Sequence, residues 1–491
     1  MISLTLNIGK LFHTLEAQRT LQFMLENKYL DPTAQKAYLD GINGCVEHVM
    51  VVQETLQHAK LNKKTVHLTS FDCEDAFGSV PHMLIPHVMS HYFLPETIIT
   101  YITSLYTKLQ GKVCTKDWDT EIFRFLKGVF QGDPYSGVIF LIVFNPLIEH
   151  IKKHKETHGY SISTVKHGVK SVITTPFADD FNLITQNKTM HQELVTDVEN
   201  KIKSMGLVIK PKKCRSLSIH KGKTVNIQFQ LKDKETGDNI NIASVIEKPM
   251  KFLGSEVAES NTRKAMFASL YSKLKQKLEN IDNSTLRGEY KTAIYSRYAL
   301  PSLRYYFSVH QIHKTHEEKL DALARLYLKK WLGIQKHGVT DTAIFHPYML
   351  GLKAPSHLYK EAHAGNHAIV RTKGDPIVNH ALDSRLEREE AWKLKNSTIV
   401  EVQNMWQKYQ NEIQIKKTQG KNAVNTQNNS VKNAKKFMKD ELKKQTICDW
   451  NTRVRKLTFQ GDFTKLQIDE KEKFFGKVLP TISQKESCHL H

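Results

Sequence analysis

The feature that most constrains this chain is a pair of adjacent carboxylates, Asp179 and Asp180, in the stretch Phe177–Asp180. The flanking segments 172–175 and 181–184 are apolar or β-prone, which predicts a strand, a tight turn and a second strand, with the acids near the turn. Two carboxylates this close repel each other unless a cation neutralises them, and Mg²⁺ takes oxygen ligands of this kind. Because aspartate also favours turns, a solvated turn is the alternative interpretation of these four residues.

The charge of the chain indicates its class of partner. A formal net charge of +21 on 491 residues favours a polyanion, with nucleic acid first and an anionic membrane as the competing partner. The longest apolar run, residues 137–144, is too short to cross a bilayer and predicts a buried core helix. The N-terminus lacks a secretory pattern and the six cysteines lack paired spacing, so we expect an intracellular protein, nuclear or cytoplasmic, without a membrane partner.

Periodicity and turn residues predict the elements of the first half of the chain. In chain order they are helices over 5–30 and 44–60, a strand over 66–71 that runs into Asp72, helices over 84–93 and 97–108, a hairpin near 110–127, an apolar helix after Pro134, a helix over 189–205, a strand over 207–209, a basic turn over 210–213, a hairpin candidate over 223–242 and a strand over 250–252.

Composition predicts five regions. They are an α+β domain over 1–255, a helical region over 256–345, a helical extension over 346–410, a basic low-complexity linker or mobile tail over 411–446, and a C-terminal segment over 447–491.

Three motifs then occur in a fixed order: Asp72–Phe77, Gly128–Pro134 and Phe177–Asp180. Together they resemble the palm of reverse transcriptases, and within that class the non-LTR (LINE-like) retrotransposon group. Further segments are similar to that group's fingers (35–38 with 44–48), to its GLxxNxxK motif (206–213) and to its primer grip (252–254). The resemblance covers about residues 1–350 and implies a right-hand polymerase, in which fingers and palm with an antiparallel sheet precede an all-α thumb. A basic tail, helical or disordered, is expected after the thumb.

The resemblance also implies an activity, which is RNA-directed extension of a DNA primer on an RNA template with deoxynucleoside triphosphates. It implies two Mg²⁺ ions, with Mn²⁺ as a substitute, bridged by Asp72 and Asp179, with Asp180 as the third carboxylate. Two such ions, about 3.5–4 Å apart, would lower the pKa of the primer 3′-hydroxyl and neutralise the leaving pyrophosphate.

Further site residues follow from the same resemblance. Phe77 stands at the steric gate against the ribose 2′-hydroxyl, although a core aromatic is the alternative, and Lys213 is expected to act on pyrophosphate, although a solvated lysine is the alternative. The expected contacts to nucleotide and template come from Gln131 and Gly132, and the expected contacts to nucleic acid come from Phe252, Leu253 and Gly254.

The chain departs from the family pattern at Gly78, Ala37 and Lys210, where Asp, Gly and Asn are usual. It begins inside the first finger motif, so we expect a fragment truncated at the N-terminus and also at the C-terminus, where Cys488–His491 resembles half of a zinc knuckle. A catalytically decayed remnant that only binds nucleic acid is one alternative. An RNA polymerase or a splicing maturase is another, and Phe77 argues against its use of ribonucleotides.

Overall fold

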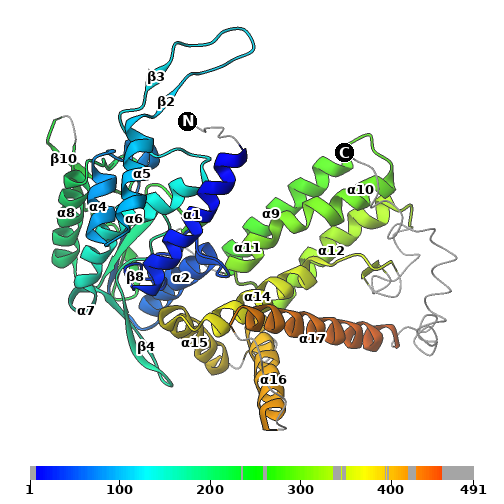
Figure 1. The fold of residues 1–491 in the computed structure, drawn as a ribbon. Coiled ribbons are helices and arrows are strands. Elements are labelled where there is room, and N and C mark those ends of the chain that lie inside the picture. Colours follow the sequence, from blue (N-terminus) through cyan, green and yellow to red (C-terminus); the bar gives the residue numbers. More distant parts are fainter. Residues whose placement is uncertain are drawn as a thin grey trace. The chain divides into compact units, whose positions relative to one another are not determined.

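A computed structural model describes residues 7–233, 236–257, 263–334, 344–345, 350–392, 394, 397–418 and 427–455. The chain divides into two compact units. Unit 1 comprises Met1–Ser260 with Gly374–Arg388, and unit 2 comprises Asn261–Lys373 with Glu389–His491. The segment that returns to unit 1 carries most of helix α15 (Pro376–Ala391), which lies beside the hairpin strand β4 (Tyr160–Thr164) in Figure 1.

A five-stranded sheet forms the centre of unit 1. Its main path runs β11 (Ala243–Ser244), β7 (Arg215–His220), β1 (Val66–Phe71) and β6 (Phe181–Thr185), and β8 (Lys223–Val225) also pairs with β7. The central strand β1 is antiparallel to both β6 and β7. Nearly all of β1 and β6 is buried, so both faces of these strands belong to the interior of the unit.

Helices pack against this sheet. The helices of unit 1 before residue 260 are α1 (Asn7–Glu26), α2 (Gly44–Leu61), α3 (Ala76–Ser79), α4 (Leu84–His91), α5 (Glu96–Thr107), α6 (Pro134–Lys153), α7 (Lys155–His158) and α8 (Lys188–Ser204). Helix α8 contacts β1 and β6, and α6 packs against α8, α4 and α1, so these helices form one group in Figure 1. The sheet and this helix group confirm the predicted α+β class.

Helix α6 is the apolar core helix that the sequence predicts. Asp133 caps it by accepting a hydrogen bond from the Tyr135 backbone N–H at 2.9 Å, and Pro134 occupies the first turn, where no N–H is needed. Among the described helices, α6 alone has the length and apolarity to cross a membrane, and 78% of its most apolar window is buried inside the protein. Each large apolar side chain buried in this way contributes about 1.5–3 kcal/mol to folding.

Four two-stranded hairpins complete unit 1. They are β2 (Gln110–Gly111) with β3 (Phe123–Arg124), β4 with β5 (Gly168–Val172), β9 (Gln230–Lys232) with β10 (Asn239–Asn241), and β12 (Met250–Phe252) with β13 (Ser255–Val257). The hairpins predicted near 110–127 and within 223–242 are therefore present.

Three details of the sequence prediction were wrong. Strand β7 was not predicted, although its residues alternate between polar and apolar. Residues 173–176 before the acid pair are not strand, because β5 ends at Val172 and pairs with β4 instead of β6. Residues 207–209 form a single bridge, Cys73 to Ile209, because the chain turns again at once.

Unit 2 is helical, as predicted. Its elements are α9 (Arg263–Asp282), α10 (Gly288–Ile294), a π-helical turn (Tyr295–Ala299), a 3₁₀ turn (Pro301–Leu303), α11 (Arg304–Val309), α12 (Lys314–Trp331), α14 (Pro355–Lys373), α16 (Thr398–Thr418) and α17 (Gln427–Arg455). Leu270, Leu274 and Leu278 of α9 are fully buried and pack in one cluster with Leu320 and Leu328 of α12.

Of the two alternatives for the basic tail, the structure shows the helical one: residues 411–418 end α16 and residues 427–446 belong to α17. The prediction of a linker or mobile tail over 411–446 is wrong for these residues, and residues 419–426 lie outside the described residues.

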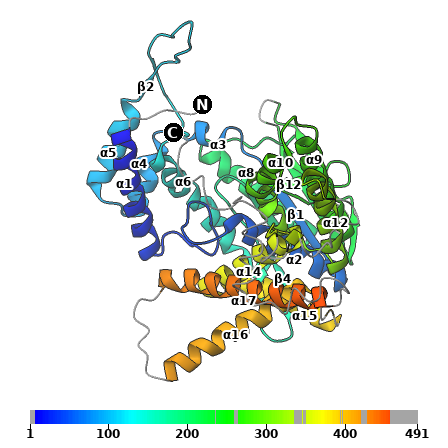
Figure 2. The ribbon, with the colours of Figure 1, turned by 90° about the vertical axis from the view of Figure 1, so that its right-hand side faces the viewer.

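The α17 residues Ala434, Met438 and Leu442 recur every four positions and are buried in one cluster with residues of α14 and α16. Figure 2 shows α17 next to α14. One apolar residue per turn is a weak signal in a Lys- and Asn-rich sequence, which explains the wrong prediction. Residues 456–491, with Cys488–His491, lie outside the described residues.

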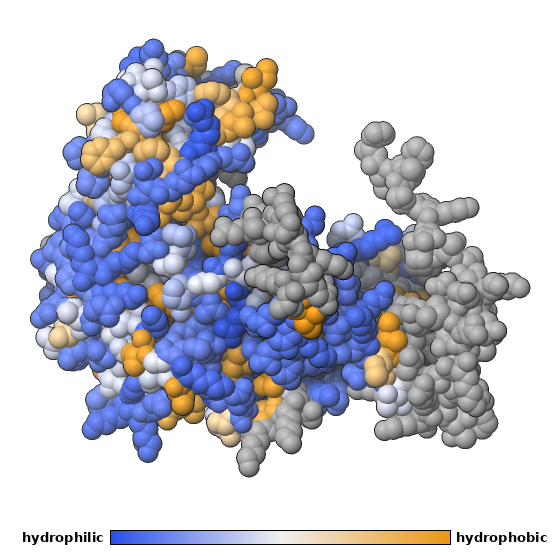
Figure 3. Space-filling model, turned by 60° about the horizontal axis from the view of Figure 1, so that its bottom comes forward, coloured by the Kyte–Doolittle hydropathy of each residue, from blue (hydrophilic) through white to orange (hydrophobic). Residues whose placement is uncertain are grey.

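Hydrophilic residues dominate the molecular face in Figure 3, on which hydrophobic side chains form separate small patches. The described residues on this face therefore form no broad apolar surface.

Candidate active site

The strand register brings the predicted carboxylates together. In the antiparallel pair β1–β6, His67 lies opposite Thr185 and Phe71 lies opposite Phe181. Continuing that register by one residue places Asp72 opposite Asp180, which follows directly after Asp179. The rings of Phe71 and Phe181 stack at a centroid distance of 4.8 Å directly behind the acids, so the site has a rigid apolar base.

The acid pair lies in a tight turn, as the sequence predicts. Phe177 and Asp180 exchange two backbone hydrogen bonds, of 2.8 and 3.1 Å, and Ala178 adopts a left-handed φ of 55° between them. A left-handed alanine is strained, so such a turn needs support from its surroundings.

Two buried side chains from the start of the chain supply that support. Gln35 accepts a hydrogen bond from the Ala178 N–H at 2.9 Å through Oε1 and donates to the Ala178 carbonyl at 3.4 Å. His48 Nε2 lies 2.8 Å from the carbonyl oxygen of Pro176. Burial, and then the charge of Lys36, lower the pKa of His48 to about 3, so the ring is neutral and donates from Nε2 to that carbonyl.

The electrostatics of the site favour a cation. Partial burial, followed by the charges of Asp179 and Asp72, raises the pKa of Asp180 to about 6. Burial and the charge of Asp72 also raise the pKa of Asp179. Among the described residues, the ligand atoms of the three aspartates do not all lie within 4.8 Å of one another. Three converging carboxylates fit a hard divalent cation, which would draw them together.

Lys213 lies beside these acids. The Lys210 N–H donates to the Asp72 carbonyl at 2.8 Å and the Glu74 N–H donates to Val208 at 2.7 Å, which fixes segment 207–213 along the end of β1. Lys213 Nζ is thereby 3.6 Å from Asp72 Oδ1, and both side chains remain solvent-accessible.

The predicted nucleotide-binding residues Phe77, Gln131 and Gly132 lie on two segments, 77–80 and 128–132, which are joined by backbone hydrogen bonds. Phe77 is half-buried, stacks on Phe140 at 4.3 Å and accepts a backbone hydrogen bond from Val129 at 2.8 Å. Gly128 has a φ of 95°, and a Cβ there would approach the backbone of Gly78 to 2.8 Å, so only glycine fits.

Gln131 and Gly132 follow Gly128 on the same segment and are exposed, so both are accessible to a ligand.

The predicted primer-grip residues lie in a separate sheet. Phe252 is buried at the end of β12, and Leu253 and Gly254 form the turn to β13 with φ values of 45° and 74°. The structure thus confirms a hairpin at this position, whereas its contact with nucleic acid stays a prediction.

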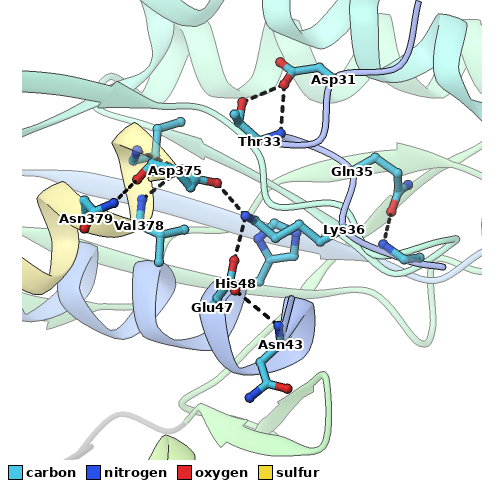
Figure 4. Close-up of polar contacts among 12 residues, drawn as sticks. Asp31, Thr33, Gln35, Lys36, Asn43, Glu47, His48, Asp375, Val378 and Asn379 are labelled. Carbon is cyan, nitrogen blue, oxygen red and sulfur yellow. Dashed lines mark hydrogen bonds and ion pairs between the residues drawn. The ribbon is translucent and has the colours of Figure 1, made fainter. Parts of the chain in front are cut away.

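Sequence reasoning assigned no role to a buried ion cluster behind the turn. Lys36 Nζ lies 2.7 Å from Glu47 and 2.5 Å from Asp375, as Figure 4 illustrates. All three side chains are at most 9% exposed. Burial alone would lower the pKa of Lys36, but the two carboxylates raise it, so the ammonium group stays charged. The sequence signal for this cluster is the pair of segments 35–38 and 44–48, which resembles the family's fingers but carries no information about Asp375.

We expect Gln35→Met to lower the rate of any reaction at this site by about 10- to 100-fold, as losses of residues that orient metal ligands do. Methionine preserves the volume but removes the acceptor for the strained Ala178 N–H. The measurement is the rate of primer extension as a function of Mg²⁺ concentration, and the Mg²⁺ requirement should rise.

Gln53→Met is the matched control, because Gln53 is also buried and its amide nitrogen has no hydrogen-bond partner among the described residues. Equal rates and equal Mg²⁺ requirements in the two variants would contradict a positioning role for Gln35.

The comparisons with known proteins agree with this geometry. Residues 5–257, more than half of the chain, match the model of the family described as reverse transcriptase (RNA-dependent DNA polymerase). The chain is 23% identical over 312 residues to a retrovirus-related Pol polyprotein from the type-2 retrotransposable element R2DM of Drosophila melanogaster, which covers 60% of this chain and 27% of that protein. It is 22% identical over 343 residues to the R2 Pol polyprotein of Nasonia vitripennis, which covers 68% of this chain and 31% of that protein.

The chain thus spans about a third or less of the length of these two curated relatives. Among solved structures, apo telomerase from Candida tropicalis aligns with a TM-score of 0.37 and 14% identity, which covers 76% of this chain and 61% of that one. The match over residues 5–257 contains all three motifs and the aspartates that β1 and β6 bring together. The chain belongs to the reverse transcriptase (RNA-dependent DNA polymerase) family.

Proposed function

We propose that this chain is an RNA-directed DNA polymerase that extends a DNA primer on an RNA template with deoxynucleoside triphosphates. The observation that carries the proposal is the β1–β6 register, in which Phe71 pairs with Phe181, so that the strands end directly beside Asp72 and Asp180 in a chain of this family. The RNA template, the DNA primer and the deoxynucleoside triphosphates would be the partners and substrates of the whole protein.

The metal ligands would be Asp72, Asp179 and Asp180, because family members use divalent ions and these acids supply only oxygen donors. Two Mg²⁺ ions bound there, or Mn²⁺ in their place, would activate the primer hydroxyl and neutralise the leaving pyrophosphate. The raised pKa values of Asp179 and Asp180 support this assignment, since an uncompensated carboxylate cluster takes up a proton instead.

Other residues would position the substrates. Lys213 lies 3.6 Å from Asp72 and would bring positive charge to the leaving pyrophosphate. The exposed Gln131 and Gly132 would contact the incoming nucleotide and template, with Gln131 offering donors and Gly132 allowing close backbone approach. The hairpin turn Phe252–Gly254 would contact the primer strand.

Charge supports nucleic acid as the polyanionic partner in preference to a membrane. The formal net charge is +21, and the long apolar helix α6 is mostly buried inside unit 1 and so offers a membrane little apolar surface.

Phe77→Val should weaken discrimination against ribonucleotides by about 10- to 100-fold, because a smaller side chain leaves room for the 2′-hydroxyl. The half-buried Phe77 stacks on Phe140, so its ring has no space to move away from the 2′-hydroxyl of a bound ribonucleotide. The measurement is the ratio of kcat/KM for deoxynucleotide and ribonucleotide insertion. An unchanged ratio in an active variant would assign Phe77 to the core alone.

The test of the proposed function is primer extension on an RNA template with Mg²⁺ and deoxynucleotides. Templated extension supports the proposal. Salt-sensitive duplex binding without extension would instead identify a remnant that only binds nucleic acid.

A further inference from the structure

A second group of metal-ligating side chains lies on the helical layer of unit 1. His150 lies in the last turn of α6, His154 follows four residues later as the residue that caps this helix, and α8, which packs against α6, carries Asp197. His150 Nε2 lies 2.5 Å and His154 Nε2 lies 4.0 Å from Asp197 Oδ2. Among the described residues, these three are a group whose ligand atoms all lie within 4.8 Å of one another.

This geometry is close to that of a bound transition metal. Two histidines four residues apart on one helix face are a common chelating pair, and a carboxylate from a second helix supplies the third ligand. In tetrahedral zinc sites with bonds of about 2.1 Å, neighbouring ligand atoms are about 3.4 Å apart, so small side-chain rotations suffice here. The ring of His158 in α7 lies 5.1 Å from that of His154 and is a candidate fourth ligand.

The group is also accessible to an ion. The side chains of His150, His154 and Asp197 are 29%, 35% and 46% exposed, so an ion can reach them from solvent.

The alternative is a simple hydrogen-bonded pair of His150 with Asp197. That pair does not explain why His154 Nε2 lies only 4.0 Å from the same oxygen, Asp197 Oδ2, whereas one bound ion would contact all three side chains. We propose that His150, His154 and Asp197 form a binding site for a divalent transition metal such as Zn²⁺, separate from the catalytic carboxylates.

The site lies far along α6 from the segment Gln131–Gly132. His150 is sixteen residues beyond Pro134, or about 24 Å along the helix axis at 1.5 Å per residue. An ion there would link α6 to α8, and α8 packs directly on β1 and β6. Its effect would therefore be to stabilise the layer under the catalytic strands, independently of whether the chain polymerises DNA.

The test uses the full chain without a polyhistidine tag, in millimolar Mg²⁺ to occupy the aspartates, with Zn²⁺ added at micromolar concentration. We expect Zn²⁺ to raise Tm and Co²⁺ to give visible d–d absorption. Both effects should disappear in His150→Ala/His154→Ala. The matched control is His87→Ala/His91→Ala, since His87 and His91 are exposed at the same spacing on α4 but lie outside any such ligand group among the described residues.

Asp197→Asn is the second variant, for the case that the double variant fails to fold, because asparagine keeps the side-chain shape of aspartate. Its Zn²⁺ affinity should fall at least about tenfold. An equal Tm increase in the two double variants, or no increase in the unmodified chain, would overturn the proposal. Unchanged affinity in Asp197→Asn would overturn it as well. Every readout is independent of primer extension.

Discussion

Replacing Lys36 by methionine is expected to lower the free energy of unfolding of unit 1 by about 3–5 kcal/mol, because it leaves two buried carboxylates without their cation. Lys36 Nζ lies 2.7 Å from Glu47 and 2.5 Å from Asp375, and the lysine side chain is 2% exposed. Asp375 also caps α15 by accepting from the backbone N–H groups of Ile377 and Val378, so the substitution should loosen residues 374–388 as well.

Hydrogen exchange of peptides from β1 and α2, measured by mass spectrometry, reports the stability of unit 1 specifically. Lys203→Met is the control, since Lys203 is exposed on α8 and surface substitutions change stability by only about 0.5 kcal/mol. Adding Glu47→Gln and Asp375→Asn to Lys36→Met should restore most of the loss, because the buried charges are then removed together. A Lys36 single variant as stable as its Lys203 counterpart would refute the account of this cluster.

The second large effect is expected at the catalytic turn. Asp179→Asn should reduce primer extension by at least about 10³-fold, or about 4 kcal/mol in activation free energy, because it removes a charged metal ligand at constant volume. Affinity for primer–template duplex should stay the same or increase slightly, since one negative charge near a polyanion is lost. The measurement pairs single-turnover extension with duplex binding at fixed salt.

Asp119→Asn is the matched control for that substitution. Asp119 is exposed in the segment joining β2 and β3 and pairs with Lys112 at 2.8 Å, a surface ion pair worth about 0–1 kcal/mol. If Asp179→Asn extends primers at the same rate as the Asp119→Asn control, Asp179 is not a metal ligand.

The sequence predicted the elements whose signals are local. The β-prone run before Asp72 and the acid-tipped turn at Phe177–Asp180 were both placed correctly, because alternation and turn residues report on neighbouring positions. Family motifs then associated Asp72 with Asp179 and Asp180, and the β1–β6 register supplies the physical reason for their proximity.

What could not be predicted depends on contacts between distant positions. Gln35 and Ala178 are 143 residues apart, and Lys36 and Asp375 are 339 apart, so no periodicity connects them. A lysine in a short polar segment is usually solvated, and only the fold shows that Lys36 is enclosed by two acids. Likewise, His150, His154 and Asp197 became a candidate site only when α6 and α8 were seen to pack together.

The most direct measurement is insertion of one nucleotide opposite each of four RNA template bases, with Mg²⁺ and all four deoxynucleotides present. The account predicts that the unmodified chain adds the complementary deoxynucleotide in every case, and that Asp72→Asn, Asp179→Asn and Asp180→Asn add none while still binding the duplex. A chain that binds the duplex tightly but adds no nucleotide, or adds nucleotides regardless of the template base, would contradict template-directed polymerisation at Asp72, Asp179 and Asp180.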